Sequence, residues 1–325
     1  MRMIQETLPV FTNAEYIRAH LLLATRVAYM MGRKLEEADW ANVYCAAKGI
    51  PEQGWSNLNI DVMHQGLGVE HKMLGIHSDK PIVTWCGTTQ MHPSLTRSIR
   101  INSTDDDPNA VMRDVFAQYA ELVEKRKAKV RETTSGEEID MRIGWLLWRR
   151  NLSEFLYFEY AMIPPNPKHY WAKWEERTKG TSRKGSKNLW VYHKKTKQKR
   201  YSITTQAGVK IQPYFDVPLP DDPHLYLFTV QGELLNSGVV RIWVTASTAR
   251  ELERILGDLS ADHLSAAIVE AGSNMEVIQE GGIVAEDEAR SILLTKEAYF
   301  SLTRAFPGVS DEHRVQLFVA YLRER

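Results

Sequence analysis

The sequence predicts an α/β protein in which helices flank a mixed central sheet and a C-terminal α+β region follows. Apolar residues recur at helical spacing from Asn13 to Gly32, and Asp107-Pro108 opens a second helical stretch with proline at its first position. Between these stretches, Ile60–Leu74 has the pattern of two short strands joined by a glycine-containing turn. Helices on both sides of a hairpin favour a layered α/β arrangement.

Length and composition are those of an ordinary globular protein. The chain has 325 residues, 43% of them apolar and 25% charged, enough for two domains or one large domain. We place a boundary near residue 165, with the central core in 1–165 and a basic segment and α+β region in 166–325. The sequence contains no run of about 18 apolar residues, so it predicts no membrane span. The N-terminus lacks the apolar core of a signal peptide.

The two cysteines, Cys45 and Cys86, both lie in apolar surroundings. Two cysteines are too few for a disulfide framework or a thiolate zinc site. We therefore expect buried free thiols and a reducing, cytoplasmic location.

The remaining elements of the first half follow from local signals. Lys34–Lys48 reads as a helix that Gly49 ends. The β-branched and aromatic residues of Pro81–Cys86 predict a third strand. A further long helix is expected over Glu137–Tyr160, before two prolines.

The second half reads as strands and then helices. LWVY and RYSITT form a predicted hairpin, and LYLFTV and VVRIWVT are two more predicted strands. Helices are expected over 248–256, 262–271, 296–305 and 311–323.

The charge is segregated along the chain although the net charge is zero. Residues 165–200 contain nine lysines and three arginines against two glutamates, a net charge of +10. A basic segment on an otherwise acidic protein indicates a polyanion partner held at one place.

The predicted hairpin carries the residues that point to chemistry. Asp61 lies on its first strand, and Glu70 and Lys72 lie two apart on its second, so they share one face of the sheet. With 26 Glu and 18 Lys in the chain, roughly one Glu-x-Lys triplet is expected by chance, and the chain has one. The context is more informative, because charged residues between apolar ones in a sheet are costly to bury unless they are paired or bind metal.

This order of elements resembles the core of the PD-(D/E)XK nuclease superfamily, which includes the type II restriction endonucleases. The resemblance covers roughly Lys34 to Val130: a helix, the Asp-bearing strand, the Glu-x-Lys strand, a third strand and a helix. It departs from the motif in that Ile60, and not proline, precedes Asp61.

The resemblance implies roles for four residues. Asp61 and Glu70 would ligate Mg²⁺ through carboxylate oxygens. Lys72 would orient or help to deprotonate the attacking water and offset charge in the transition state. The preceding helix would add a glutamate, for which Glu36 and Glu37 are the candidates, with Glu37 favoured.

The function implied is Mg²⁺-dependent, sequence-specific hydrolysis of double-stranded DNA by a restriction-type endonuclease. Cutting both strands needs two sites, so a homodimer is expected. Two alternatives remain open. One is a non-enzymatic DNA-binding protein in which Asp61, Glu70 and Lys72 are structural, and the other is a repair or defence nuclease that acts on modified DNA.

The basic segment is the expected DNA-contacting surface, with tryptophans and tyrosines for packing or stacking. A β-ribbon carrying its lysines would be able to enter the major groove of duplex DNA. The candidate DNA-binding residues are Arg97, Arg100, Lys184, Lys187, Lys194, Lys195, Lys197, Lys199 and Arg200.

Four histidines, His64, His71, His77 and His92, fall within 29 residues. They suggest a transition-metal site, but no spacing among them matches a helical i, i+4 pair or a zinc knuckle. Separate polar or core histidines are the preferred interpretation, with His71 facing away from Glu70 and Lys72.

Overall fold

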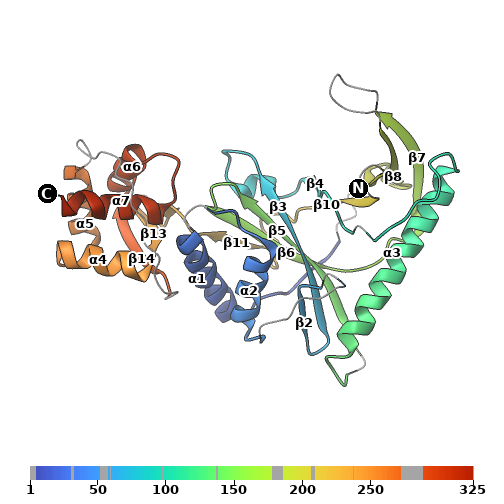
Figure 1. Ribbon diagram of the computed structural model, residues 1–325, viewed down its shortest axis with the longest axis horizontal. Helices are drawn as coiled ribbons and strands as arrows, with labels where there is room; N and C mark the ends of the chain where they lie inside the picture. The colour runs from blue at the N-terminus through green and yellow to red at the C-terminus, as the bar shows by residue number, and fades with distance from the viewer. Residues whose placement is uncertain are drawn as a thin grey trace.

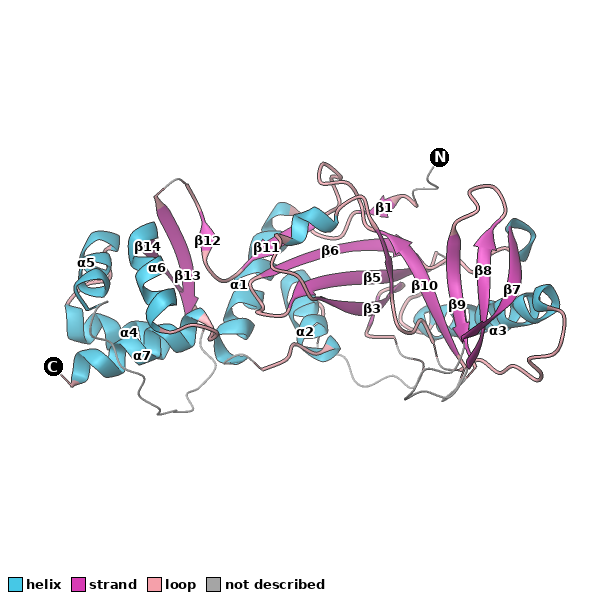
Figure 2. Cartoon of the chain, turned by 90° about the horizontal axis from the view of Figure 1, so that it is seen from above, coloured by secondary structure: helices cyan, strands magenta, loops and turns pink. Residues whose placement is uncertain are grey.

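The computed structural model describes residues 5–30, 33–51, 58, 60–96, 98–136, 138–177, 186–205, 209–236, 238–271 and 288–324. Within these ranges the chain forms seven α-helices and three β-sheets, which confirms a mixed α/β protein. Figure 2 shows the three sheets following one another along the molecule, with the C-terminal helices at one end and α3 at the other.

The central sheet is mixed and has the strand order β1-β6-β5-β3-β2, with β11 also paired to β6. β3 and β5 are parallel, and the chain between them passes through α3; the other pairs are antiparallel. The strands are β1 (Thr7–Leu8), β2 (Val62–His64), β3 (Leu67–Ile76), β5 (Asp140–Arg149), β6 (Glu154–Ala161) and β11 (Tyr226–Thr229).

Helices cover both faces of the central sheet (Figure 1). α1 (Asn13–Met30) and α2 (Glu37–Lys48) pack on one face and share a hydrophobic core with β3, β5, β6 and β11. α3 (Pro108–Arg131) packs on the other face and links it to the second sheet through a second core. α3 begins as predicted, because the Asp107 side chain accepts a hydrogen bond of 2.9 Å from the Ala110 amide.

The predicted helix over Glu137–Tyr160 is wrong, because this stretch forms the antiparallel strands β5 and β6. Ile143 and Trp145 face the α3 core, whereas Leu146 and Trp148 face the α1/α2 core. Since both faces of β5 are buried, no residue from Ile143 to Trp148 is polar. Such a run lacks the alternation that distinguishes a strand from a helix.

The predicted third strand over Pro81–Cys86 is also wrong. Ile82–Trp85 is a short 3₁₀ helix, and the Ile82 amide donates a 3.2 Å hydrogen bond to the Glu154 carboxylate. Tertiary contacts therefore override the β propensity of this short segment. The strand that pairs with β3 along its length is β5.

The second sheet is antiparallel, with the order β4-β10-β9-β8-β7. The predicted hairpin of the basic segment is confirmed as β8–β9, and β7 lies beside it. The strands are β4 (Thr89–Met91), β7 (Tyr170–Arg177), β8 (Ser186–His193), β9 (Lys199–Thr204) and β10 (Lys210–Asp216).

The C-terminal region has its own hydrophobic core, which runs from Val240 to Val319. The four predicted helices are confirmed as α4 (Ala246–Leu256), α5 (Ala261–Ala271), α6 (Lys296–Ala305) and α7 (Asp311–Arg323). They surround a sheet of β12 (Glu233–Leu234), β13 (Val239–Val244) and β14 (Arg290–Thr295).

The hydrophobic core around α3 contains residues from Ile60 to Val217. Among the described residues, no helix has the length and apolar character that crossing a membrane requires.

Candidate active site

The site is organised by the β2–β3 hairpin. Gln65 and Gly66 at its turn have φ values of 46° and 86°, the left-handed pair that suits a two-residue hairpin. β2 pairs with β3 only as far as Val69. Among the described strands, none pairs with the same edge of β3 beyond that point, so the edge is open where the candidate residues lie.

Glu70 is 1% exposed and is bound by two cations. Its Oε1 lies 2.7 Å from Lys72 Nζ, and its Oε2 forms an ion pair with Arg126 NH1 from α3. Arg126 is fully buried and also donates from Nε to the carbonyl of Leu58 at 3.0 Å. The two cations offset the cost of burying the carboxylate.

Asp61 lies directly before β2, at the open edge of β3. Its amide donates to the Val69 carbonyl at 2.9 Å, which extends the hairpin ladder by one bond. Its Oδ2 accepts a 2.6 Å hydrogen bond from the amide of His71. The carboxylate is thereby fixed beside the backbone between Glu70 and Lys72.

The electrostatics of Asp61 indicate a cluster of carboxylates. Burial raises the pKa of Asp61 to about 6, although the hydrogen bond from His71 and the charge of Lys72 act in the opposite direction. The negative charges of Glu37 and Glu70 raise this pKa further. Such a group ionises more easily when a cation binds beside it.

Glu37 enters the cluster from a different element. It is the first residue of α2, and Glu36, the other candidate, precedes it at the N-cap position. The negative charge of Glu37 is one of the smaller influences that raise the pKa of Asp61. The structure thus brings Asp61, Glu70 and Lys72 together at the β2–β3 hairpin, whereas Glu37 lies at the start of α2.

The donor set suits a hard divalent cation, because all three acidic side chains offer carboxylate oxygens. Both oxygens of Glu70 contact cationic side chains, so metal binding by Glu70 would compete with Lys72. Across the part of the chain that the structure describes, no three His, Cys, Asp or Glu side chains are grouped closely enough to hold a metal ion. Asp61, Glu70 and Glu37 are therefore not grouped as a three-ligand site in this arrangement of the described residues.

The histidines do not form a site of their own. The prediction that His71 faces away from Glu70 is confirmed: it is fully buried, against the rings of Trp40 and Tyr44. His92 Nδ1 and Nε2 lie 2.8 Å and 3.2 Å from the carbonyls of Ser94 and Met73. Burial lowers the pKa of His92 to about 4, and the charge of Lys72 contributes to that shift.

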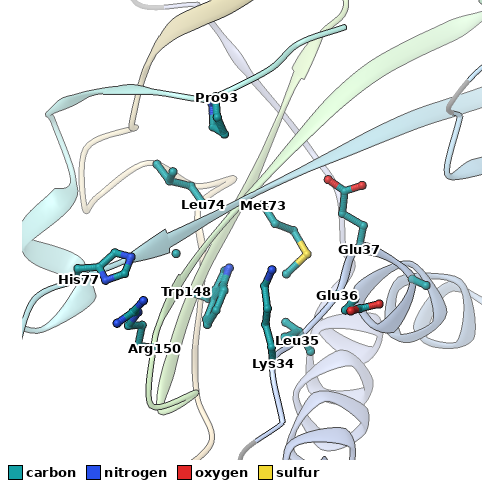
Figure 3. Close-up of a pocket in the computed structure, with 12 residues that line it drawn as sticks. Lys34, Leu35, Glu36, Glu37, Met73, Leu74, His77, Pro93, Trp148 and Arg150 are labelled. Carbon is teal, nitrogen blue, oxygen red and sulfur yellow. The ribbon is translucent and has the colours of Figure 1, made fainter. Parts of the chain in front are cut away.

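A pocket of about 960 Å³ adjoins the cluster and shares Glu37 with it. It lies between the start of α2 and the second half of β3. Figure 3 shows His77 and Arg150 at one end, Glu37 at the other, and Trp148 and Lys34 between them. The remaining lining residues are Leu35, Glu36, Ala38, Met73, Leu74, Gly75 and Pro93.

The predicted DNA-binding residues are not gathered at one place. Arg97 and Lys184 lie outside the described residues. Arg100 is exposed. Its backbone amide donates a hydrogen bond to the side chain of Gln118 on α3. Lys187 pairs with Asp105, 3.2 Å away, near the start of α3.

The idea of a free β-ribbon for the major groove is corrected by the structure, because β8 and β9 are internal strands of a five-stranded sheet. Arg200 pairs with Asp216 at 2.8 Å and is thereby held within the sheet. Three of the predicted lysines are exposed around the β8–β9 turn: Lys194, Lys195 and Lys197.

Lys199 joins an aromatic and cationic row on the second sheet. Its Nζ lies 3.8 Å from the ring centre of Trp190 and 4.9 Å from that of Tyr214. On the neighbouring strands, the rings of Trp171 and Tyr192 stack with centres 4.6 Å apart. This face offers planar rings beside positive charge, the combination that nucleic acids contact.

Arg126, which pairs with the second carboxylate oxygen of Glu70, was not predicted from the sequence. A signal was present, because Arg126 falls between Val123 and Val130 on the buried stripe of α3. A charged residue on such a stripe must find a buried partner. The pocket was also missed, since it is built from segments far apart in the sequence.

The comparisons with known proteins returned no match, whether the chain was compared with family models, with curated proteins or with solved structures.

The raised pKa of Asp61 predicts an unusual dependence of stability on pH. The folded protein keeps this proton up to about pH 6, whereas the unfolded chain releases it near the ordinary value of 3.8. The free energy of unfolding should therefore fall as the pH rises from 4 to 6. Asp61→Asn keeps an acceptor for His71 and should be more stable than the wild type at pH 7.5 by about 1–3 kcal/mol.

Urea unfolding at pH 4 and pH 7.5 measures this effect. The exposed Asp79, changed to Asn, is the matched control and should not alter the pH dependence. An Asp61→Asn variant whose stability follows that of the wild type at both pH values would contradict the electrostatic description of the cluster.

Proposed function

We propose that the protein is a Mg²⁺-dependent endonuclease with a PD-(D/E)XK-like core that hydrolyses phosphodiester bonds in DNA. One observation carries the proposal: Asp61, Glu70 and Lys72 lie together at the β2–β3 hairpin, where the Asp61 carboxylate accepts a hydrogen bond from the amide of His71, between Glu70 and Lys72. The Glu70 and Lys72 side chains are 1% and 11% exposed, whereas Asp61 is half-buried and Glu37 is exposed at the start of α2.

In this proposal each side chain has a distinct task. Asp61 and Glu70 hold Mg²⁺, with Glu37 assisting, and Mg²⁺ would supply Lewis-acid stabilisation of the phosphate and of the attacking water. Lys72 orients that water and offsets negative charge on the phosphate as the bond breaks. Arg126 positions Glu70 from α3 and does not contact the substrate.

The second sheet provides the proposed contact surface for double-stranded DNA. Lys194, Lys195 and Lys197 at the β8–β9 turn are exposed, and Lys199 lies on the aromatic row nearby. A homodimer would present two such surfaces and two sites, one for each strand of the duplex.

A prediction follows for the salt dependence of DNA binding. Changing Lys194, Lys195 and Lys197 together to glutamine should weaken binding and reduce the slope of log K against log salt by roughly 2 to 3. Fluorescence anisotropy with a labelled duplex at several salt concentrations measures this slope. Lys125, Lys127 and Lys129 of α3 are the matched control, because each is paired to a glutamate.

A second candidate function, a non-enzymatic DNA-binding protein, is favoured by the pairing of both Glu70 oxygens with Lys72 and Arg126. Digestion of a sequenced plasmid with Mg²⁺ or with EDTA, followed by mapping of the ends, separates the two. Discrete fragments that need Mg²⁺ support a restriction-type enzyme. Cleavage only of modified plasmid supports a repair or defence nuclease, and DNA binding without cleavage supports the non-enzymatic protein.

A further inference from the structure

We infer that the pocket beside Glu37 receives one unpaired nucleotide of the DNA strand, next to the phosphate that is cleaved. The inference rests on the proposed function for the position of the scissile phosphate, but not for the chemistry of the pocket. Its volume of about 960 Å³ accommodates a nucleotide together with part of the adjoining backbone.

The charges of the pocket indicate an anion at one end. Lys34, His77 and Arg150 line it, and none of them has an ion-pair partner among the described residues. The neighbouring Arg149 shows the contrast, because it is held by Glu154 at 2.9 Å. All three side chains are exposed to the pocket opening, so they are free to contact a phosphate that enters it.

The rest of the lining suits a nucleobase. Met73 and Leu74 of β3, Trp148 of β5 and Pro93 give the pocket apolar walls. The Trp148 indole packs closely against Gly75, where a Cβ atom would lie 3.2 Å from the nearest ring atom. A phosphate backbone alone needs no such apolar surface, whereas an extruded base does.

The position of the pocket connects it to the cluster. In Figure 3 the cationic end with Arg150 and His77 lies opposite Glu37, and Met73 of the pocket wall directly follows Lys72 on β3. A nucleotide bound with its own phosphate at Arg150 and Lys34 would direct the next phosphate of the strand towards Glu37. The pocket would thus set which bond reaches Asp61 and Lys72.

Binding of single-stranded DNA without any divalent cation tests this inference separately from catalysis. Fluorescein-labelled oligo(dT) of twelve residues is titrated in EDTA with the full chain and with the variants Arg150→Gln and Lys34→Gln. Each variant should bind about tenfold more weakly, because a charge-assisted phosphate contact is lost. Arg304→Gln, at an exposed position of α6, is the matched control and should change the affinity less than twofold.

Photocrosslinking of the same oligonucleotide carrying 5-iodouracil locates the base. Crosslinks in the peptides that contain Met73–His77 or Trp148 are expected, and Arg150→Gln should reduce them. Crosslinks confined to the second sheet around Trp190, or equal affinities of Arg150→Gln and Arg304→Gln, would overturn the inference. Because no step in either measurement is cleavage, an absence of nuclease activity would refute the proposed function and leave this result intact.

Discussion

Replacing Lys72 with methionine is expected to lower the rate of DNA cleavage by at least about a hundredfold. Methionine keeps most of the length of the side chain but removes the ammonium, whose Nζ lies 2.7 Å from Glu70. The loss arises because no other described cation occupies this position at the open edge of β3; Arg126 approaches Glu70 from the opposite, buried side. Single-turnover cleavage of a labelled duplex in Mg²⁺ measures the rate.

The control is Lys80→Met, which removes an exposed lysine shortly after β3. It should cleave at the wild-type rate. Since Lys72 also pairs with a buried carboxylate, circular dichroism and urea unfolding must show that Lys72→Met is folded under the assay conditions. A folded Lys72→Met variant that cleaves within fivefold of the wild type would exclude the catalytic role of this lysine.

Replacing Arg126 with methionine should produce the largest loss of stability, about 3–5 kcal/mol in the free energy of unfolding. Among the described residues, the change leaves the 1% exposed Glu70 with Lys72 as its one cationic partner. It also removes the hydrogen bond to the Leu58 carbonyl. Urea unfolding at pH 7.5 measures the loss, and Arg113→Met, at an exposed position of the same helix, should change the stability by less than about 0.5 kcal/mol.

A double variant shows whether the loss comes from the buried charge. Glu70→Gln combined with Arg126→Met removes both members of the pair and should be more stable than Arg126→Met alone. If the double variant is the less stable of the two, the effects are additive and the ion pair does not explain the stability of this region.

The sequence predicted those elements whose signals are local. α3 begins at the Asp107-Pro108 cap, and α6 and α7 have the expected bounds, because caps and amphipathic periodicity are properties of short windows. β5 and β6 were not predicted, because burial on both faces removes the alternation of a strand. The strand predicted over Pro81–Cys86 was wrong for a different reason. A hydrogen bond to Glu154 of a distant strand sets the conformation of this segment.

In the candidate site, too, local patterns were predicted from the sequence and long-range contacts were not. The hairpin pattern predicted that Asp61, Glu70 and Lys72 would be neighbours, because the order of two adjacent strands is fixed by their turn. The apolar stripe of α3 indicates that Arg126 needs a buried partner, but no local pattern identifies Glu70, 56 positions away in the chain, as that partner. The cationic pocket likewise depends on how α2, β3 and β5 are packed.

Mg²⁺-dependent cleavage by the wild type and by Asp61→Asn, measured side by side on the same DNA, tests the proposed nuclease site most directly. Asp61→Asn keeps the hydrogen bond from the His71 amide but removes the charge that would hold the metal. We expect cleavage by the wild type only with Mg²⁺, and a loss of at least about a hundredfold in the variant with DNA binding unchanged. Equal cleavage by both proteins, or cleavage by neither of them on modified or unmodified DNA, would contradict a metal-dependent nuclease site at the edge of β3.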